Sequence, residues 1–359
     1  KNKMYGMNSS GHSPYAISAD KVDEIPKRGW IPVTVPGAVK GWKALSERFG
    51  SLPFKKLLEP AIDYARNGYP VSAEIARMWK KALNAIPNSE EFKSWYDTFT
   101  FDGKTPEPGQ MICMPKLADA LEKIADTNTD ALYYGELADR IDEESKRFGG
   151  FLRKQDLEDH KVEWVNPIHV DYHGYQVWEL PPNGQGIVAL MALNVLNNFQ
   201  FKDRDVDCIH TQMEALKMAF ADAKEYVTDP KCMNMPVDDL ISVDYGKQRA
   251  SQIGHLALPP RVDKPHGSGT VYLCTADKDG NMVSYIQSNY MGFGSGIVVD
   301  GVSLQNRGYD FSLDPSHVNY LMPHKKTYHT IIPGFLTKDD KPVGPFGVMG
   351  GYMQPQGHM

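Results

Sequence analysis

The pattern of apolar and polar positions divides the chain into a helical part and a strand-rich part. From about residue 33 to 235, apolar residues recur mainly at the three- and four-residue spacing of amphipathic helices. The helix expected in "PFKKLLEPAIDYARNGYPVS" ends at Asn67-Gly68, and the one in "DCIHTQMEALKMAFADAKEYVTDP" ends at Asp229-Pro230. One strand pair is expected inside this part, in "HVDYHGYQVWELPP", with its turn at His173-Gly174.

From Thr270 onward the pattern changes to strands. In "GSGTVYLCTADKDGNMVSYIQS" the residues alternate between two faces, and Asp279-Gly280-Asn281 has the composition of a hairpin turn. The strands expected here cover residues 270–276, 282–288, 296–299, 329–337 and 342–348. Before them, residues from about 236 to 268 are rich in proline, glycine and basic residues, which predicts an exposed, mobile linker.

Composition narrows the class of protein. The chain has 359 residues, a formal net charge of -6 and no long basic run, which argues against nucleic acid as a partner. No stretch approaches ~18 consecutive apolar residues, so no membrane span is expected. The four cysteines are scattered without metal-ligand spacing; they are expected to be buried thiols, although a single bridge stays open. The compartment is undetermined, with a slight preference for the cytoplasm, and no metal or cofactor is indicated.

Both ends of the chain are expected to be truncated. The sequence begins with "KNKMYGMNSS", without a start methionine, and stops at "MGGYMQPQGHM", directly after a glycine pair and without a closing helix. A signal peptide can therefore not be read from it.

Thr270 raises a question of chemistry, because it stands at the first strand position directly after Gly267-Ser268-Gly269. One interpretation is structural: threonine is common in strands. The other is catalytic: a chain that cuts itself after Gly269 gives Thr270 a free amine, which can act as the base for its own weakly nucleophilic hydroxyl. The strand alone does not decide between the two.

Four blocks of the sequence match one known family in order and spacing. They are "VTVPGAVKGWKALSERFGSLPFKKLLEPAIDYARNGYPVS", "LPPNGQGIVALMALNVL", "TVYLCTADKDGNMVSYIQSNYMGFGSGIVV" and "YHTIIPGFLTKDDKPVGPFGVMGGYMQPQG". On these blocks the chain resembles the γ-glutamyltransferase (glutathione hydrolase) family of N-terminal-nucleophile hydrolases, in its cephalosporin-acylase-like branch. The resemblance covers nearly the whole chain. The family's first strand-helix segment and its last helices and strands are expected to be missing from this sequence.

The resemblance implies an α+β fold, a four-layer αββα sandwich produced by autocleavage of a precursor. Residues 1–269 would belong to a mostly helical large subunit and residues 270–359 to a strand-rich small subunit, which together form one catalytic domain. The implied activity is hydrolysis of a γ-glutamyl or related dicarboxylic acyl amide through an acyl-enzyme, with acyl transfer to amines as a side activity. The implied partners are this small-molecule substrate and the two subunits. The resemblance does not decide whether the protein also forms a homodimer.

The resemblance also assigns a catalytic group. Thr270 aligns with the nucleophile, and the bond between Gly269 and Thr270 with the cleavage site. Ser288 aligns with a hydroxyl that would hydrogen-bond the new amine or the nucleophile, and a half-buried strand serine is an equally good interpretation. Gly350-Gly351 aligns with the pair whose backbone amides stabilise the tetrahedral oxyanion, where the missing Cβ allows a close approach to the substrate.

The expected acyl pocket departs from the family. Ser10, in "NSSGHSP", stands where the γ-glutamyl enzymes have a carboxylate-binding arginine, and Tyr290 stands where they have asparagine or glutamate. Asp310 matches the partner of the substrate's α-amino group, and Arg307 replaces a glutamine. Arg307 either supplies the cation that Ser10 lacks, with a planar fork suited to a carboxylate, or only pairs with Asp310.

His329-Thr330 replaces the family's substrate-holding hydroxyl pair. Thr330 keeps a hydroxyl, whereas His329 is either a ligand contact or a strand histidine with a satisfied ring. The family's second threonine is lost at Val271, and the segment after Phe311 is shorter than in the transpeptidases, which predicts a more open pocket.

The loss of the arginine at Ser10 and of the second threonine at Val271 supports a second hypothesis, a catalytically impaired homologue that acts as a binding or structural protein. Retention of Thr270, Asp310 and Gly350-Gly351 favours the enzyme.

Overall fold

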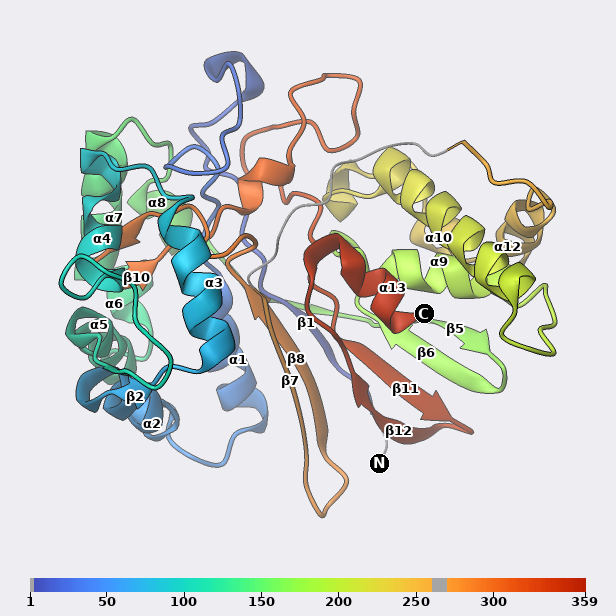
Figure 1. The fold of residues 1–359 in the computed structure, drawn as a ribbon, viewed down its shortest axis with the longest axis horizontal. Helices are drawn as coiled ribbons and strands as arrows, with labels where there is room; N and C mark the ends of the chain where they lie inside the picture. Colours follow the sequence, from blue (N-terminus) through green and yellow to red (C-terminus); the bar gives the residue numbers. More distant parts are fainter. Residues whose placement is uncertain (1–2, 260–269) are drawn as a thin grey trace.

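The computed structural model of this chain describes residues 3–259 and 270–359 (Figure 1). The expected cleavage site at Gly269 and the last part of the expected linker, residues 260–268, lie outside the described residues. In Figure 1 a body of helices lies on one side of the molecule, strands fill the middle, and a second group of helices lies on the other side.

The first helical body is built from amphipathic helices around an aromatic core that includes Trp79, Trp95 and Tyr133. Ser72 caps one of these helices, because its side chain accepts a hydrogen bond from the backbone N–H of Ile75. The helices are α1 (Ala38–Phe49), α2 (Phe54–Asn67), α3 (Ala73–Leu83), α4 (Lys93–Phe99), α5 (Pro115–Asp126), α6 (Asp130–Tyr133), α7 (Glu136–Arg147) and α8 (Lys154–Glu158).

The central sheet has four strands in the order β12-β11-β6-β5, with every neighbouring pair antiparallel. The hairpin expected at His173-Gly174 is present, with His173 in a left-handed conformation. Helix α9 packs on β5 and β6, and α10 packs on α9 (Figure 1). The bounds are β5 (Ile168–Tyr172), β6 (Tyr175–Glu179), β11 (Gly334–Lys338), β12 (Lys341–Phe346), α9 (Gly186–Leu196) and α10 (Val206–Tyr226).

A second pair of strands, β7 (Thr270–Ala276) and β8 (Met282–Ser288), has the bounds that the sequence predicts. The turn between them is stabilised by Asp277, whose side chain accepts hydrogen bonds from the backbone of Asp279 and Asn281. The hairpin packs against β12, so it lies beside the central sheet (Figure 1). The α+β class is therefore confirmed.

Short elements complete the architecture. The strand expected over 329–337 begins only at Gly334, because Pro333 has no backbone N–H and the chain before it forms only a single bridge, between His329 and Gly184. The other short elements are β1 (Gly6–Asn8), β2 (Tyr69–Pro70), β3 (Met111–Ile112), β4 (Glu163–Val165), β9 (Val298–Val299), β10 (Val302–Ser303), η1 (Ala19–Lys21), η2 (Glu90–Phe92), η3 (Pro230–Cys232), η4 (Arg307–Asp310), η5 (Gly351–Met353) and α13 (Gln354–His358).

The segment expected to be a linker instead contains two helices in its described part, α11 (Val237–Leu240) and α12 (Val243–Ala250). Tertiary contacts explain the difference. Asn194 on α9 donates hydrogen bonds to the carbonyls of Ile241 and Ser242 at the start of α12. Composition alone could not predict this packing on α9.

The cysteines differ in part from the expectation. All four lie in the described part of the chain and are free thiols. Cys208 is buried as predicted, but Cys113, Cys232 and Cys274 are exposed, so the prediction of buried thiols was wrong for these three. Cys274, for example, lies on β7, which is mostly exposed. Within residues 3–259 and 270–359, the helices are too short or too polar to cross a membrane.

Candidate active site

Thr270 is the first residue of β7 and lies directly opposite Ser288, the last residue of β8. The two hydroxyl oxygens are 3.0 Å apart, within hydrogen-bonding distance. Ser288 Oγ also accepts a 2.8 Å hydrogen bond from the backbone N–H of Tyr290. The hairpin register therefore brings the expected nucleophile and the second hydroxyl together, and both side chains are half-buried.

Gly350 precedes η5 and Gly351 begins it, both in backbone conformations that favour glycine, with φ of 148° and 61°. Any other residue type would be strained at either position. Gly351 is buried, and its carbonyl accepts a 2.8 Å hydrogen bond from Nε2 of Gln185. The same Gln185 nitrogen donates to the carbonyl of Thr330 at 2.7 Å, so one side chain connects the glycine pair to the expected pocket.

The segment from Phe346 to Gly350, which leads to this glycine pair, runs along β7 toward Thr270. Ser284, which lies opposite Cys274, donates to the carbonyl of Phe346. The next residue, Gly347, lies against Tyr272, since a Cβ at Gly347 would be 2.4 Å from that ring. The segment thus passes from the level of Cys274 to that of Tyr272 before it reaches Gly350.

Asp310 lies at the end of η4, and its side chain is only 4% exposed. Its Oδ1 accepts hydrogen bonds from the hydroxyls of Tyr290, at 2.6 Å, and Tyr352, at 3.2 Å. Its Oδ2 lies 3.5 Å from Nη1 of Arg307. Burial raises the pKa of the Asp310 carboxyl to about 6, and the positive charge of Arg307 and the two tyrosine hydroxyls oppose that rise.

Arg307 is 3% exposed and stacks on the ring of Tyr290, with its guanidinium carbon 4.1 Å from the ring centroid. Its Nη1 donates a 2.8 Å hydrogen bond to the hydroxyl of Thr330. Its Nε and Nη2 are buried and have no hydrogen-bond partner among the described residues. Burial lowers the pKa of Arg307, while Asp310 and Tyr290 oppose this shift.

His329 is held by its backbone and by its own neighbours. Its N–H donates to the carbonyl of Asn183, its carbonyl accepts from the N–H of Gln185, and its ring Nδ1 accepts from the N–H of Ile331 at 3.3 Å. Burial keeps the pKa of His329 well below its usual value, so the ring is neutral. These contacts favour the structural interpretation of this histidine.

Ser10 does not join the Arg307–Asp310 cluster through any described hydrogen bond. Its hydroxyl donates to Oδ1 of Asn8, at 2.7 Å, and is 3.2 Å from Oδ1 of Asn183. Ser10 is therefore connected to the cluster only indirectly, through Asn183 and the backbone of His329.

Two residues of this network were not singled out in the sequence. Gln185 connects Thr330 to Gly351, and Tyr352 binds Asp310. Both belong to blocks that carry the family resemblance, "LPPNGQG" and "MGGYMQ". Their place in these blocks was the signal in the sequence that could have identified them.

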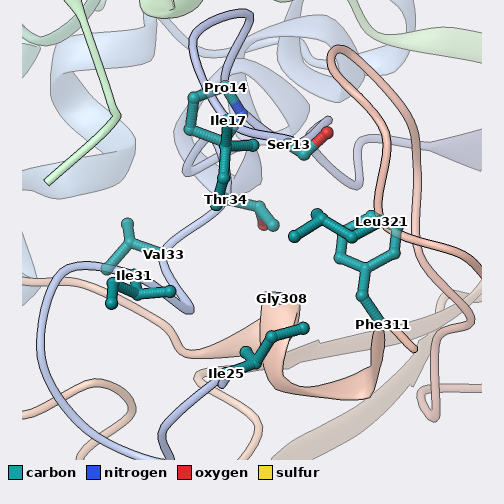
Figure 2. Close-up of a pocket in the computed structure, with 10 residues that line it drawn as sticks. All are labelled: Ser13, Pro14, Ile17, Ile25, Ile31, Val33, Thr34, Gly308, Phe311 and Leu321. Atoms are coloured by element: carbon teal, nitrogen blue, oxygen red, sulfur yellow. The ribbon is translucent and has the colours of Figure 1, made fainter. Parts of the chain in front are cut away.

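A small hollow lined in part by Gly308 of η4 is distinct from this site (Figure 2). It encloses about 10 Å³, room for no more than a water molecule, and none of its lining residues is one of the expected site residues. Its mostly apolar lining consists of Ser13, Pro14, Ile17, Ile25, Ile31, Val33, Thr34, Gly308, Phe311 and Leu321.

Known proteins similar to this chain include several proenzymes. The chain is 40% identical to the glutathione hydrolase-like YwrD proenzyme of Bacillus subtilis (strain 168), over 99% of this chain and 68% of that protein. It is 33% identical to the oxamate amidohydrolase proenzyme of Klebsiella pneumoniae, over 92% of this chain and 64% of that protein. The chain thus spans roughly two thirds of the length of these relatives. Proenzyme relatives imply two subunits that arise from one precursor.

A solved structure matches throughout the chain. The crystal structure of cephalosporin acylase from Bacillus halodurans is 50% identical, with a TM-score of 0.96, and the match covers 100% of this chain and 68% of that one. It confirms the expected fold, that of the N-terminal-nucleophile hydrolases. The family model described as Gamma-glutamyltranspeptidase matches residues 1–359. The chain therefore belongs to the gamma-glutamyltranspeptidase family, a family of hydrolases and transferases made as proenzymes.

Proposed function

We propose that this protein is an autoprocessing N-terminal threonine amidohydrolase that cleaves an amide of a carboxylate-bearing acyl group. The observation that carries the proposal is the position of Thr270: it begins a strand, is half-buried, and its hydroxyl lies 3.0 Å from that of Ser288. A threonine in that position becomes a nucleophile once its own amine is free.

The processing step is an acyl shift followed by hydrolysis. Oγ1 of Thr270 attacks the carbonyl carbon of Gly269, the C–N bond between the two residues breaks, and the nitrogen leaves as the free amine of Thr270. The product is an ester between Gly269 and Oγ1, which water hydrolyses. Residues 1–269 then belong to the large subunit and residues 270–359 to the small one.

Turnover repeats this chemistry on an external amide. The free amine of Thr270 accepts the proton of Oγ1, which attacks the substrate carbonyl, and the negative charge develops beside the backbone amides of Gly350-Gly351. The leaving amine takes the proton as its C–N bond breaks, and water hydrolyses the acyl ester to the free acid. Ser288 orients the attacking hydroxyl. An amine that replaces water would give acyl transfer as a side activity.

The buried cation of Arg307 supports an acyl group with a carboxylate. A planar guanidinium in a water-poor site binds a carboxylate with two parallel hydrogen bonds. The Klebsiella relative is named for an amide that itself bears a carboxylate, oxamate. γ-Glutamyl and related dicarboxylic acyl groups meet the same requirement.

The test is the fate of the full-length protein on a denaturing gel, with the fragments identified by mass spectrometry. We expect the wild-type chain to give two fragments, the smaller of which begins at Thr270. Thr270→Ala should remain one chain, whereas Thr270→Ser should still be cleaved. Thr275→Ala, on the exposed part of the same strand, is the matched control and should be cleaved normally.

Two results would contradict the proposal. Cleavage of Thr270→Ala at the same bond would exclude Thr270 as the nucleophile. A wild-type chain that stays intact and inactive would favour the catalytically impaired homologue instead.

A further inference from the structure

The chain itself supplies the hydrogen-bond donors around the Asp310 carboxylate. Oδ1 accepts from the hydroxyls of Tyr290 and Tyr352, and Oδ2 faces Nη1 of Arg307. Tyr290 is 1% exposed, so the hydrogen bond of its hydroxyl to this carboxylate is shielded from solvent. A substrate ammonium would have to displace a 2.6 Å hydrogen bond to reach Oδ1.

Tyr290 is held in this place against its backbone preference. Its φ is 72°, a left-handed conformation that is uncommon for an aromatic residue. Two hydrogen bonds help to maintain it: its N–H donates to Ser288 Oγ, and its hydroxyl donates to Asp310. One residue therefore connects the hydroxyl pair of the expected nucleophile to the charged end of the pocket.

Arg307 shows the opposite situation, because part of its hydrogen-bonding capacity is unused. Its Nε and Nη2 form the edge of the guanidinium that binds a carboxylate with two parallel hydrogen bonds. Elsewhere in this chain Arg249 uses that same edge on Asp222, at 3.0 and 2.6 Å. On Arg307 this edge is buried and unpartnered among the described residues, which is unfavourable unless a ligand oxygen binds there.

We infer that Tyr290 determines the acyl specificity: its hydroxyl takes the place of a substrate ammonium on Asp310, while Arg307 binds the substrate carboxylate. The site then takes acyl groups that carry a carboxylate but no α-amino group, which makes monoamides of short dicarboxylic acids the substrate class. An acyl group with an ammonium would have to displace the Tyr290 hydroxyl to pair with Asp310, and would otherwise bury its charge without a direct contact to this carboxylate. The inference rests on the proposed function and refines it.

Two anilides that differ only in the α-amino group provide the test, glutaryl-p-nitroanilide and γ-glutamyl-p-nitroanilide. We expect the wild-type enzyme to prefer the glutaryl compound by more than about tenfold in kcat/KM. Tyr290→Ala opens the space before Asp310 and should reduce that preference at least about tenfold, mainly by lowering KM for the γ-glutamyl compound. Tyr290→Phe, which removes only the hydroxyl, should give a smaller change in the same direction.

Tyr285→Phe is the matched control. Tyr285 is a tyrosine on β8 whose hydroxyl bonds Gln287 and Trp42 instead of Asp310. It should leave the preference unchanged. A wild-type enzyme that uses both anilides equally, or a preference that Tyr290→Ala does not alter, would overturn the inference.

Binding of the free acids separates this inference from the proposed function. Calorimetry on the wild-type protein should show glutarate binding more tightly than L-glutamate, and Tyr290→Ala should narrow the difference. If this result is obtained although neither anilide is hydrolysed, the specificity assignment stands and the amidohydrolase proposal fails. Equal binding of the two acids, or binding of neither, would overturn the assignment itself.

Discussion

Two arginine–aspartate pairs in this protein have the same charges but different geometry. Arg249 and Asp222 join α12 to α10 through two hydrogen bonds, from Nε and Nη2 to the two carboxylate oxygens. Their side chains are 20% and 12% exposed. Arg307 and Asp310 are more deeply buried, at 3% and 4%, yet they meet through a single contact of 3.5 Å.

The difference lies in where the remaining hydrogen bonds go. In the first pair each group satisfies the other, which is the arrangement of a structural contact. In the second pair Asp310 is satisfied by two tyrosines, and the equivalent edge of Arg307 is left without a described partner. A buried charge that its neighbours leave incompletely bonded is costly for folding, so its retention is better explained by ligand binding than by stability.

The largest expected effect distinguishes the two arginines by their role. Arg307→Lys keeps the charge but removes the planar edge, and it should raise KM for glutaryl-p-nitroanilide on the order of 10²-fold while kcat changes much less. Arg249→Lys makes the same chemical change in the structural pair and should leave KM within about twofold. Steady-state kinetics would check this, on variants that have first been shown to be cleaved into their two subunits.

A neutral acyl anilide is the internal control for that experiment. It lacks the carboxylate, so Arg307→Lys should affect it little. An equal loss on the neutral and the anionic anilide would show that Arg307 only shapes the loop, and the contrast between the two pairs would then disappear.

The second prediction concerns stability. Arg249→Ala leaves the mostly buried Asp222 without its bidentate partner and should lower the free energy of unfolding by about 2 kcal/mol, since hydrogen bonds to charged groups contribute in that range. Urea denaturation followed by circular dichroism would measure it. The double variant Arg249→Ala/Asp222→Ala should lose little more free energy of unfolding than either single variant. Strictly additive losses would mean that the two side chains do not stabilise each other.

The third prediction uses pH. The pKa of Asp310 is about 6, so this carboxyl is ionised at pH 7.5 and neutral at pH 5. As it becomes neutral it no longer offsets the charge of Arg307, and the binding of an anion should strengthen. We expect the inhibition constant of glutarate to fall about fivefold from pH 7.5 to pH 6, a window in which both carboxyls of glutarate stay largely ionised. Asp310→Asn should bind glutarate with little dependence on pH. A constant that rises from pH 7.5 to pH 6 in the wild type would contradict this assignment.

Local sequence predicted the part of the site that lies on a hairpin. The alternation after Thr270 and the turn at Asp279-Gly280-Asn281 specify both strands of β7–β8. Because a hairpin turn fixes the register, the pairing of Thr270 with Ser288 follows from the same residues. The fold of the whole chain came from the family resemblance and not from any pattern of this kind.

The contacts between loops could not be predicted in this way. Tyr352 and Tyr290 share one oxygen of Asp310 although the three residues belong to separate segments, and no periodicity places loops relative to one another. The helices α11 and α12 show the same limit. Their local composition is typical of a linker, yet they fold because they pack on α9.

The smallest expected effect tests how strongly Tyr352 contributes to the Asp310 cluster. Its hydroxyl is 3.2 Å from Oδ1, a longer contact than the 2.6 Å of Tyr290. Tyr352→Phe removes a donor to the ionised carboxylate, so the pKa of Asp310 should rise further and the pH dependence of glutarate inhibition should shift upward. Near pH 6.5 more of Asp310 would then be neutral, and glutarate should bind about threefold more tightly than to the wild type. The same pH series on Tyr285→Phe, whose hydroxyl bonds Gln287 and Trp42, should superimpose on the wild-type curve. A Tyr352→Phe curve that moves toward lower pH would mean that this hydroxyl does not stabilise the ionised carboxylate, and that Tyr290 and Arg307 alone control its charge.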